Sequence, residues 1–169
     1  LPDSGPPVAY EPLAWHDFFV MLGGASAALA GLVFVGLSIH ARAVASDPLH
    51  RVRARNLTAG IVSVTIMSAL VLTPGQGLTA LGVELVIGGA FLGFVFSAPL
   101  RLYRTRVDSG LLARTAGAVA ASVLTVWAGA SLLAHGGGGL YFLVVSGLFG
   151  ILLNVFGAWT LLVGLARDE

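Results

Sequence analysis

Long apolar stretches alternate along the chain with short polar breaks. Five stretches, at 18–39, 56–73, 78–100, 115–134 and 140–166, are long enough to cross a bilayer, because a helical span needs about 20 mostly apolar residues. The breaks have turn chemistry: residues 73–77 read TPGQG, and His135 is followed by four glycines, which do not readily continue a helix. The pattern predicts an all-α polytopic membrane bundle of five transmembrane helices.

Helix starts and the amino-terminal arm refine this prediction. Asp47 precedes Pro48, which places a capping carboxylate before a first-turn proline, so the second helix should begin near Pro48. Asp108 and Ser109 offer similar capping for the fourth helix. Residues 1–14 hold four of the seven prolines, so we expect an extended extracytoplasmic arm there and a single transmembrane domain over 15–169.

Composition agrees with a membrane protein and excludes several other classes. The chain is 57% hydrophobic, 10% charged and has a mean hydropathy of +0.93, whereas a soluble domain carries about 25% charged residues. Without cysteine it has no disulfide or thiolate metal site. Basic residues are all arginine, which is typical of a GC-rich bacterial genome, and we expect a multi-pass protein of the bacterial cytoplasmic membrane.

The arginines predict the orientation. All nine follow the first, third or fifth span: Arg42, Arg51, Arg53, Arg55, Arg101, Arg104, Arg106, Arg114 and Arg167. Arginine-rich short loops stay in the cytoplasm, so the amino terminus should lie outside and the carboxyl terminus inside. A four-span alternative, with one apolar stretch in the interface or buried, would put arginine clusters on opposite faces of the membrane.

Two pairs of segments resemble each other in layout. Residues 28–42 align with 90–104, and 54–69 align with 113–128, with matching Ala, Gly, Val and Arg positions. Helices one and two therefore resemble helices three and four as a parallel repeat. The fifth helix is left for docking or oligomerisation.

Glu84 is the only ionisable residue well inside a span, about 10 Å below the end of the third helix at 1.5 Å per residue. Intramembrane carboxylates usually face a bundle interior or a watery cavity. The functional interpretation is a cation or proton site, such as a carboxylate ring in an oligomer. The structural alternative is a hydrogen-bonded glutamate near the interface.

Small and polar residues at helical spacing form candidate packing stripes, because small residues let membrane helices approach closely. They are Gly23, Ala27 and Gly31; Gly89 and Gly93; and Ser146, Gly150, Asn154 and Ala158. Leucine at Gly31 or Gly150 should therefore damage assembly. Hydroxyls share faces in two other spans, at Thr58, Thr65 and Ser68 and at Thr115, Ser122 and Thr125. Two interpretations stay open: these hydroxyls line a polar path through the membrane, or they donate hydrogen bonds to carbonyls of their own helix.

The remaining chemistry concerns lipids and partners. Arg51, Arg55, Arg101, Arg104 and Arg106 are candidate contacts for anionic lipid headgroups, or they serve only as topology determinants. Arginines so close to the bilayer disfavour a nucleic-acid partner. No catalytic, phosphate-loop or dinucleotide motif is present, so we expect no enzyme activity, no metal and no cofactor.

Two function classes remain from the sequence. The first is a small homo-oligomeric channel or transport protein for a cation or proton, with Glu84 and the hydroxyl stripes along its path. The second is a non-catalytic membrane scaffold or accessory subunit that packs against partner transmembrane helices.

Overall fold

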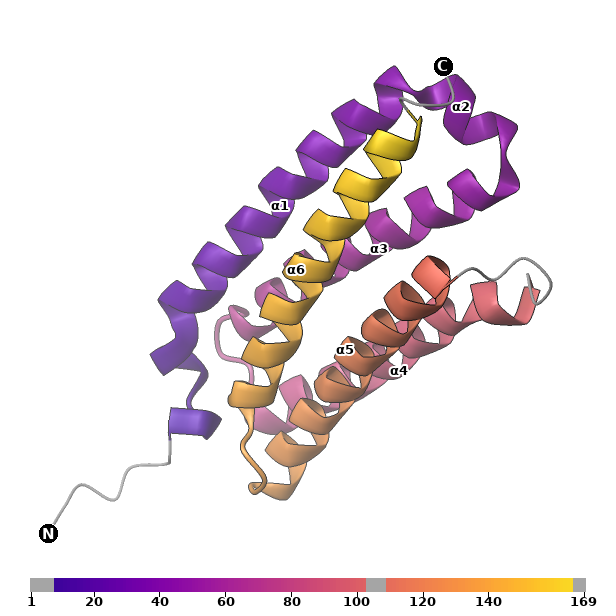
Figure 1. Cartoon of the computed structure of the whole chain (residues 1–169). Helices are drawn as coiled ribbons and strands as arrows, with labels where there is room; N and C mark the ends of the chain where they lie inside the picture. The colour runs from indigo at the N-terminus through magenta and orange to yellow at the C-terminus, as the bar shows by residue number, and fades with distance from the viewer. Residues whose placement is uncertain (1–7, 103–108, 166–169) are drawn as a thin grey trace, which may run out of the picture.

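The computed structural model describes residues 8–102 and 109–165, and over these residues the chain is a helical bundle without strands (Figure 1). Its helices are α1 (His16–Ile39), α2 (Ala41–Ser46), α3 (Pro48–Val71), α4 (Leu78–Leu102), α5 (Ser109–Ala134) and α6 (Leu140–Leu165). Two 3₁₀ helices, η1 (Val8–Tyr10) and η2 (Pro12–Trp15), precede them. Five of the helices are long and apolar enough to cross a membrane, which confirms the predicted fold class.

Local capping chemistry sets the start of α3. Asp47 has an extended backbone, and its Oδ1 accepts a hydrogen bond of 2.9 Å from the backbone N–H of Leu49. Pro48 occupies the first helical turn, where its missing N–H costs nothing. The predicted start at Pro48 is confirmed, whereas the proposed cap at Asp108 lies outside the described residues. The short helix α2 fills the connection before Asp47 and had no counterpart in the apolar pattern.

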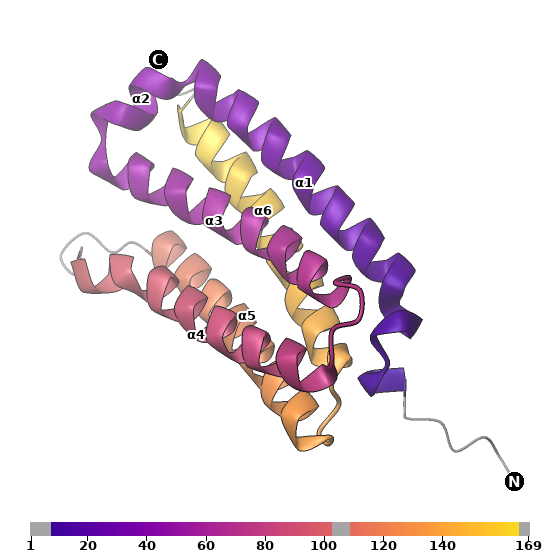
Figure 2. The ribbon, with the colours of Figure 1, turned by 180° about the vertical axis from the view of Figure 1, so that it is seen from behind.

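The five long helices pack as two groups (Figures 1 and 2). Helices α4 and α5 make the most extensive helix–helix contact and form a hairpin. Helix α1 packs on α3, and α6 packs on α3 and more lightly on α1, which makes a three-helix unit. Helix α6 contacts α5 more extensively than it contacts α3, and so joins the two groups. The pairs α1–α3 and α4–α5, with α6 as a fifth helix, have the layout expected for a parallel repeat. The repeat itself stays a prediction.

Glycines allow α4 and α5 to approach closely. A Cβ added at Gly89 would lie 2.8 Å from Cγ2 of Val126 and 3.0 Å from the carbonyl oxygen of Ser122. Gly82 and Gly129 face each other in the same way farther along the two helices. Close backbone approach through small residues is how membrane helices maximise packing contacts without a hydrophobic driving force. The hairpin α4–α5 is therefore a tightly packed unit of its own.

The buried core is divided unequally between the two ends of the bundle. One cluster takes residues from all five long helices: Phe19, Leu22, Val64, Val71, Leu81, Leu85, Ala128, Leu132, Leu140 and Leu143. The other takes residues from α1, α3 and α6 alone: Val33, Ala54, Leu57, Ile61 and Leu161. At the first end this cluster holds the hairpin α4–α5 to the three-helix unit, and among the residues whose side chains the structure describes the second cluster has none from the hairpin.

The described part of the amino-terminal arm is folded against the bundle rather than extended. Ala9 is buried, and the hydroxyl of Tyr10 accepts a 3.1 Å hydrogen bond from the backbone N–H of Gly138. The indole N–H of Trp15 donates to the carbonyl of Val8 over 2.9 Å. Pro12 lies in the described part of the arm, and it begins a 3₁₀ turn because proline fits the first position of η2.

Charged residues separate along the bundle axis. The described arginine side chains lie where α1 ends and where α3 and α5 begin, and we call this end the basic end: Arg42, Arg51, Arg53, Arg55 and Arg114. Glu11, Asp17 and Glu84 lie toward the other end, which carries the glycine loop 136–139, whereas Asp47 lies at the basic end, where it caps α3. The gathering of arginines at one end is the pattern from which the sequence predicts that this end is cytoplasmic. The orientation in the membrane stays a prediction.

Candidate functional site

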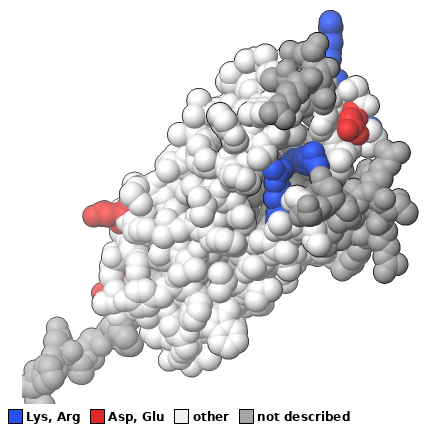
Figure 3. Space-filling model, in the orientation of Figure 1, with Lys and Arg blue, Asp and Glu red and all other residues white. Residues whose placement is uncertain are grey.

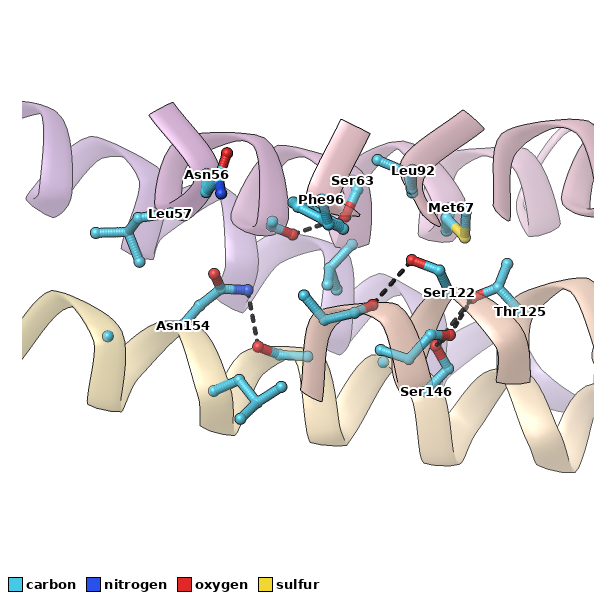
Figure 4. Close-up of a pocket in the computed structure, with 18 of the residues that line it drawn as sticks. Asn56, Leu57, Ser63, Met67, Leu92, Phe96, Ser122, Thr125, Ser146 and Asn154 are labelled. Atoms are coloured by element: carbon cyan, nitrogen blue, oxygen red, sulfur yellow. Dashed lines mark hydrogen bonds between the residues drawn. The ribbon is translucent and has the colours of Figure 1, made fainter. Parts of the chain in front are cut away.

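A cavity of about 120 Å³ lies between the hairpin α4–α5 and the three-helix unit (Figure 4). All five long helices contribute to its lining. The residues are Phe19 and Leu22 of α1; Arg53, Asn56, Leu57, Gly60, Ser63, Val64, Met67 and Ser68 of α3; Leu92 and Phe96 of α4; Arg114, Thr115, Ala118, Ala121, Ser122 and Thr125 of α5; and Leu143, Ser146, Gly147, Gly150, Leu153, Asn154, Gly157 and Leu161 of α6.

The division of the core explains where the cavity forms. The cluster that joins all five helices surrounds Leu85 and Leu132 toward the glycine-loop end, and both side chains are fully buried. Toward the basic end the second core cluster holds α1, α3 and α6 without the hairpin. The hairpin still contacts α6 toward the basic end, through Arg114 and Thr160 and through Gly117 and Leu153, and the cavity opens between α3 and α5, where Figure 3 shows arginine atoms in a hollow of the surface.

Small residues close the wall between α3 and α6. A Cβ added at Gly60 would lie 2.5 Å from Oδ1 of Asn154, and one added at Gly150 would lie 3.3 Å from Cγ2 of Val64. Farther along, a Cβ added at Gly147 would meet Leu22 of α1 at 2.7 Å. These helices can pack this closely only because glycine has no side chain. The glycines thus seal one side of the cavity.

Hydroxyl groups line the middle of the cavity and bridge α5 to α6. The hydroxyl oxygens of Thr125 and Ser146 lie 2.9 Å apart, and Ser146 also donates to the carbonyl of Ala121 over 2.8 Å. Ser122 donates to the carbonyl of Ala118 over 2.9 Å, and Ser63 donates to that of Gly60 over 2.8 Å. Since each hydroxyl has one proton and two lone pairs, groups that donate to the backbone present mainly acceptor oxygens to the cavity.

Two arginines mark the basic end of the cavity. Arg53 of α3 and Arg114 of α5 are half-buried, and Nη2 of Arg114 donates to the hydroxyl of Thr160 on α6. That bond orients the guanidinium across the α5–α6 interface. Among the described lining residues there is no aspartate or glutamate. The described lining therefore has two guanidinium groups at one end and uncharged side chains along the rest of its length.

Two amides lie near these arginines. Oδ1 of Asn56 is buried and has no hydrogen-bond partner in the described part of the chain. Asn154 donates from Nδ2 to the carbonyl of Gly150 over 2.7 Å. Figure 4 shows both amides on the same side of the cavity, away from the hydroxyls of Ser122, Thr125 and Ser146. A buried acceptor without a partner is costly, so Asn56 is a group that a ligand donor would stabilise.

Glu84 does not line this cavity. It is half-buried on α4, and its carboxylate accepts a hydrogen bond from Nε2 of Gln76 in the turn before the helix. The structure therefore does not bring Glu84 together with the hydroxyl residues that we expected to share a path with it. Its carboxylate is held by a hydrogen bond from the turn that precedes its own helix, and its role stays a prediction.

The hydroxyl stripes divide between the cavity and the helix contacts. Thr115, Ser122 and Thr125 of α5 all line the cavity, as does Ser68 of α3. Thr65 instead lies 2.8 Å from the hydroxyl of Ser26 on α1 and links these two helices. Thr58 is not among the lining residues. All three hydroxyl residues predicted to share a face of α5 therefore line the cavity, whereas of the three predicted on α3 one does.

The packing stripes also have different positions. Ser146, Gly150 and Asn154 line the cavity, while Ala158 packs against the second core cluster. Gly89 and Gly93 pack on α5, since a Cβ added at Gly93 would lie 3.6 Å from Cβ of Ser122. A Cβ added at Gly23 would lie 3.0 Å from Cβ of Ser68 on α3. Ala27 and Gly31 are exposed, and an added Cβ at Gly31 would meet nothing within 4 Å. The structure brings neither of these two into a helix contact.

The candidate lipid contacts lie partly outside what the structure describes. Arg51 and Arg55 are exposed on α3 at the basic end, where headgroups would lie. The side chains of Arg101, Arg104 and Arg106 lie outside the described residues.

The sequence interpretation missed Arg53, Arg114, Asn56 and Ser63 as site residues. A signal for them exists in the spacing of α3. Arg53, Asn56, Gly60, Ser63 and Met67 recur at alternating intervals of three and four, which places them on one helix face. A face that combines an arginine, an amide, a glycine and a hydroxyl is unusual for lipid contact and indicates a cavity.

The chain matches no protein-family model, no curated protein and no solved structure. Its function has to follow from the chemistry of its cavity.

Proposed function

We propose that this chain is a membrane transport protein that takes an anionic solute into the cavity from the basic end. The observation that carries the proposal is the lining: Arg53 and Arg114 at one end, hydroxyls and apolar side chains beyond them, and no carboxylate among the described lining residues. Ionisable residues inside a membrane protein are costly and commonly mark a substrate pathway. Guanidinium groups bind carboxylates and phosphates through paired hydrogen bonds.

The helix arrangement supports a conformational cycle. The hairpin α4–α5 is packed tightly within itself and is joined to the three-helix unit by the core cluster near the glycine-loop end and by the contact of α5 with α6. Movement of one rigid group of helices against another around a central site is the usual basis of alternating access. A hinge at the glycine-loop end would open and close the cavity at the basic end.

The cation or proton channel is a weaker proposal on this geometry. Positive charge at Arg53 and Arg114 disfavours cations in the cavity, and Glu84 lies elsewhere with Gln76 as its partner. A cation route through Glu84 would have to run between copies of the chain, as a ring of carboxylates.

A membrane scaffold is the second candidate, and the outward face of α1 favours it. Gly24, Ala27 and Gly31 are exposed, and neither glycine has an atom of the described chain within 4 Å of an added Cβ. Small-residue faces let a partner helix approach closely. A homo-oligomer or another membrane subunit would bind there.

Flux measurements in vesicles test the transport proposal. We expect the reconstituted protein to move small carboxylates or phosphates but not alkali cations. Arg53→Gln and Arg114→Gln should each reduce anion flux at least tenfold, because a charge-assisted hydrogen bond contributes about 1.5–3 kcal/mol. Arg55→Gln is the matched control, since Arg55 is exposed on the same helix and does not line the cavity.

Two other outcomes would contradict the transport proposal and identify an alternative. Cation flux that is lost in Glu84→Gln and unchanged in both arginine variants would establish the channel. No flux of any ion, together with a partner subunit that dissociates in Gly31→Leu, would establish the scaffold.

A further inference from the structure

We infer that residues 8–15 form a strap that keeps the glycine-loop end of the bundle closed, and that the hydroxyl of Tyr10 holds this strap in place. The strap comprises η1, η2 and the residue between them. Figure 1 shows it in indigo beside the loop that precedes α6, and η1 contacts α6. The inference goes beyond the transport proposal and does not depend on it.

The glycine loop is held by hydroxyl groups from outside the loop. Gly137, Gly138 and Gly139 have φ values of +89°, +104° and +49°, which glycine adopts without steric cost but with a large loss of conformational freedom. Ser131 of α5 accepts a hydrogen bond from the backbone N–H of Gly139 over 2.7 Å. Tyr10 of the strap accepts from that of Gly138 over 3.1 Å, and the two hydroxyl oxygens lie 3.4 Å apart. The strap therefore supplies half of this support.

The strap also fits closely against the loop and against α6. Ala9 is buried, and a Cβ added at Gly139 would overlap its carbonyl oxygen and would lie 3.0 Å from Cε1 of Tyr10. At the other end of the strap, the ring of Trp15 lies edge-on to that of Tyr141 on α6, with centroids 5.0 Å apart. The strap is thus attached at two places, through Tyr10 to the loop and through Trp15 to α6.

Beneath the strap lies the core cluster that joins all five long helices. Tyr10 and Trp15 both pack against this cluster. The cluster shares four residues with the lining of the cavity: Phe19, Leu22, Val64 and Leu143. It therefore separates the cavity from the strap, and a direct path from the cavity to the glycine-loop end has to part it. Release of the strap would remove one side of its packing.

Labelling of a buried cysteine in the whole purified chain tests this inference. Ala128→Cys places a single thiol in the core cluster of a cysteine-free chain, at a fully buried position that does not line the cavity. In nonionic detergent a water-soluble methanethiosulfonate should label it slowly. Tyr10→Phe should raise the labelling rate about tenfold, because the N–H of Gly138 loses its acceptor and local opening becomes easier.

The other tyrosine at this end provides a matched control. Tyr141→Phe removes a hydroxyl from an exposed residue and keeps the ring that meets Trp15. It should change the labelling rate by no more than about twofold, as is usual for an exposed substitution.

Two alanine substitutions in the loop test the close fit of the strap. Gly139→Ala should accelerate labelling at least as much as Tyr10→Phe, because its methyl group displaces the carbonyl of Ala9. Gly137→Ala adds a methyl group at a φ that is also left-handed, but this group would meet only Ser131, at 3.4 Å. It should therefore accelerate labelling less.

Amide hydrogen exchange distinguishes opening of one end from general unfolding. In Tyr10→Phe, exchange should become faster in residues 136–142 and stay unchanged in residues 54–61, which contribute to the second core cluster. Faster exchange throughout the chain would overturn the inference, because the variant would then destabilise the whole fold.

Two labelling results would also overturn the inference. No acceleration in Tyr10→Phe and Gly139→Ala would show that the cluster stays closed without the strap. Equal acceleration in Tyr141→Phe and Tyr10→Phe would show that the Tyr10 hydroxyl does not hold the strap. Labelling requires no transport, so either result would leave the transport proposal standing. Absence of flux in vesicles, with the expected labelling, would refute transport and support the strap.

Discussion

Asn154 of α6 lies directly against the backbone of Gly60 on α3. A Cβ added at Gly60 would lie 2.5 Å from Oδ1 and 2.9 Å from Nδ2 of this amide, which itself donates to the carbonyl of Gly150. The contact fixes the spacing of α3 and α6 where they form the wall of the cavity. The absence of a side chain at Gly60 therefore determines the conformation that the Asn154 side chain on the facing helix can adopt.

Gly60→Ala should destabilise the protein, because the new methyl group has to displace the Asn154 side chain. Overpacking of this kind costs about 1–3 kcal/mol. The midpoint of thermal unfolding in detergent should fall, and Asn154→Ala in the same chain should restore much of the loss. Gly24→Ala is the control, since an added Cβ there meets nothing within 4 Å. An unchanged midpoint for Gly60→Ala would show that α3 and α6 are farther apart than described.

Ser26→Ala should weaken the contact between α1 and α3. Ser26 is fully buried, and its hydroxyl lies 2.8 Å from that of Thr65. Hydrogen bonds between membrane helices contribute about 0.6 kcal/mol on average and up to about 1.7 kcal/mol. Reversible unfolding in mixed micelles should report a loss in this range. Ser38→Ala, at an exposed serine that bonds only to its own helix carbonyl at Phe34, should have a smaller effect.

Leucine substitutions at Gly31 and at Gly89 should have different effects, although the sequence pattern places both glycines in packing stripes. Gly31→Leu should leave the stability of the isolated chain unchanged, because no atom lies within 4 Å of an added Cβ. Gly89→Leu should prevent close packing of α4 on α5, because an added Cβ already lies 2.8 Å from Val126. Thermal unfolding of the purified proteins compares the two. A destabilised Gly31→Leu protein would mean that a partner covers this face of α1.

Cysteine labelling of the cysteine-free chain tests the predicted orientation. Gly136 is exposed in the loop between α5 and α6, and Ser46 is exposed at the end of α2 on the basic end. An impermeant maleimide should label Gly136→Cys in intact cells and Ser46→Cys only after permeabilisation. Labelling in the opposite order would invert the orientation and place the open end of the cavity outside.

Features set by neighbours along the chain were predictable. The five spans follow from unbroken apolar composition, and the start of α3 follows from the capping side chain of Asp47 and the ring of Pro48. The short helix α2 was not predictable, because six residues carry too little periodicity. The folded arm was not predictable either, since it depends on Tyr10 meeting Ser131 and Gly138 far along the chain.

The site required knowledge of how the helices face one another. Arg51 and Arg55 share a face of α3, and Arg53 lies about 200° around the helix from each of them. Sequence shows this difference but not which face turns inward, so Arg53 counted only as a topology determinant. Glu84 attracted attention as the lone acid within a span. Its partner Gln76 lies eight residues earlier, and their contact depends on the path of the intervening turn.

Helix α6 supplies one whole wall of the cavity and the hydroxyl of Thr160 that orients Arg114. Since a chain is synthesised from its amino terminus, α1 to α5 enter the membrane before that wall exists. The polar faces of α3 and α5 then lack the wall that α6 supplies, although α1 and α4 already contribute to the lining. Arrival of residues 140–165 is therefore the event that completes the lining of the cavity, and a nascent chain arrested before it would present membrane proteases with two hairpins around an unfinished polar groove.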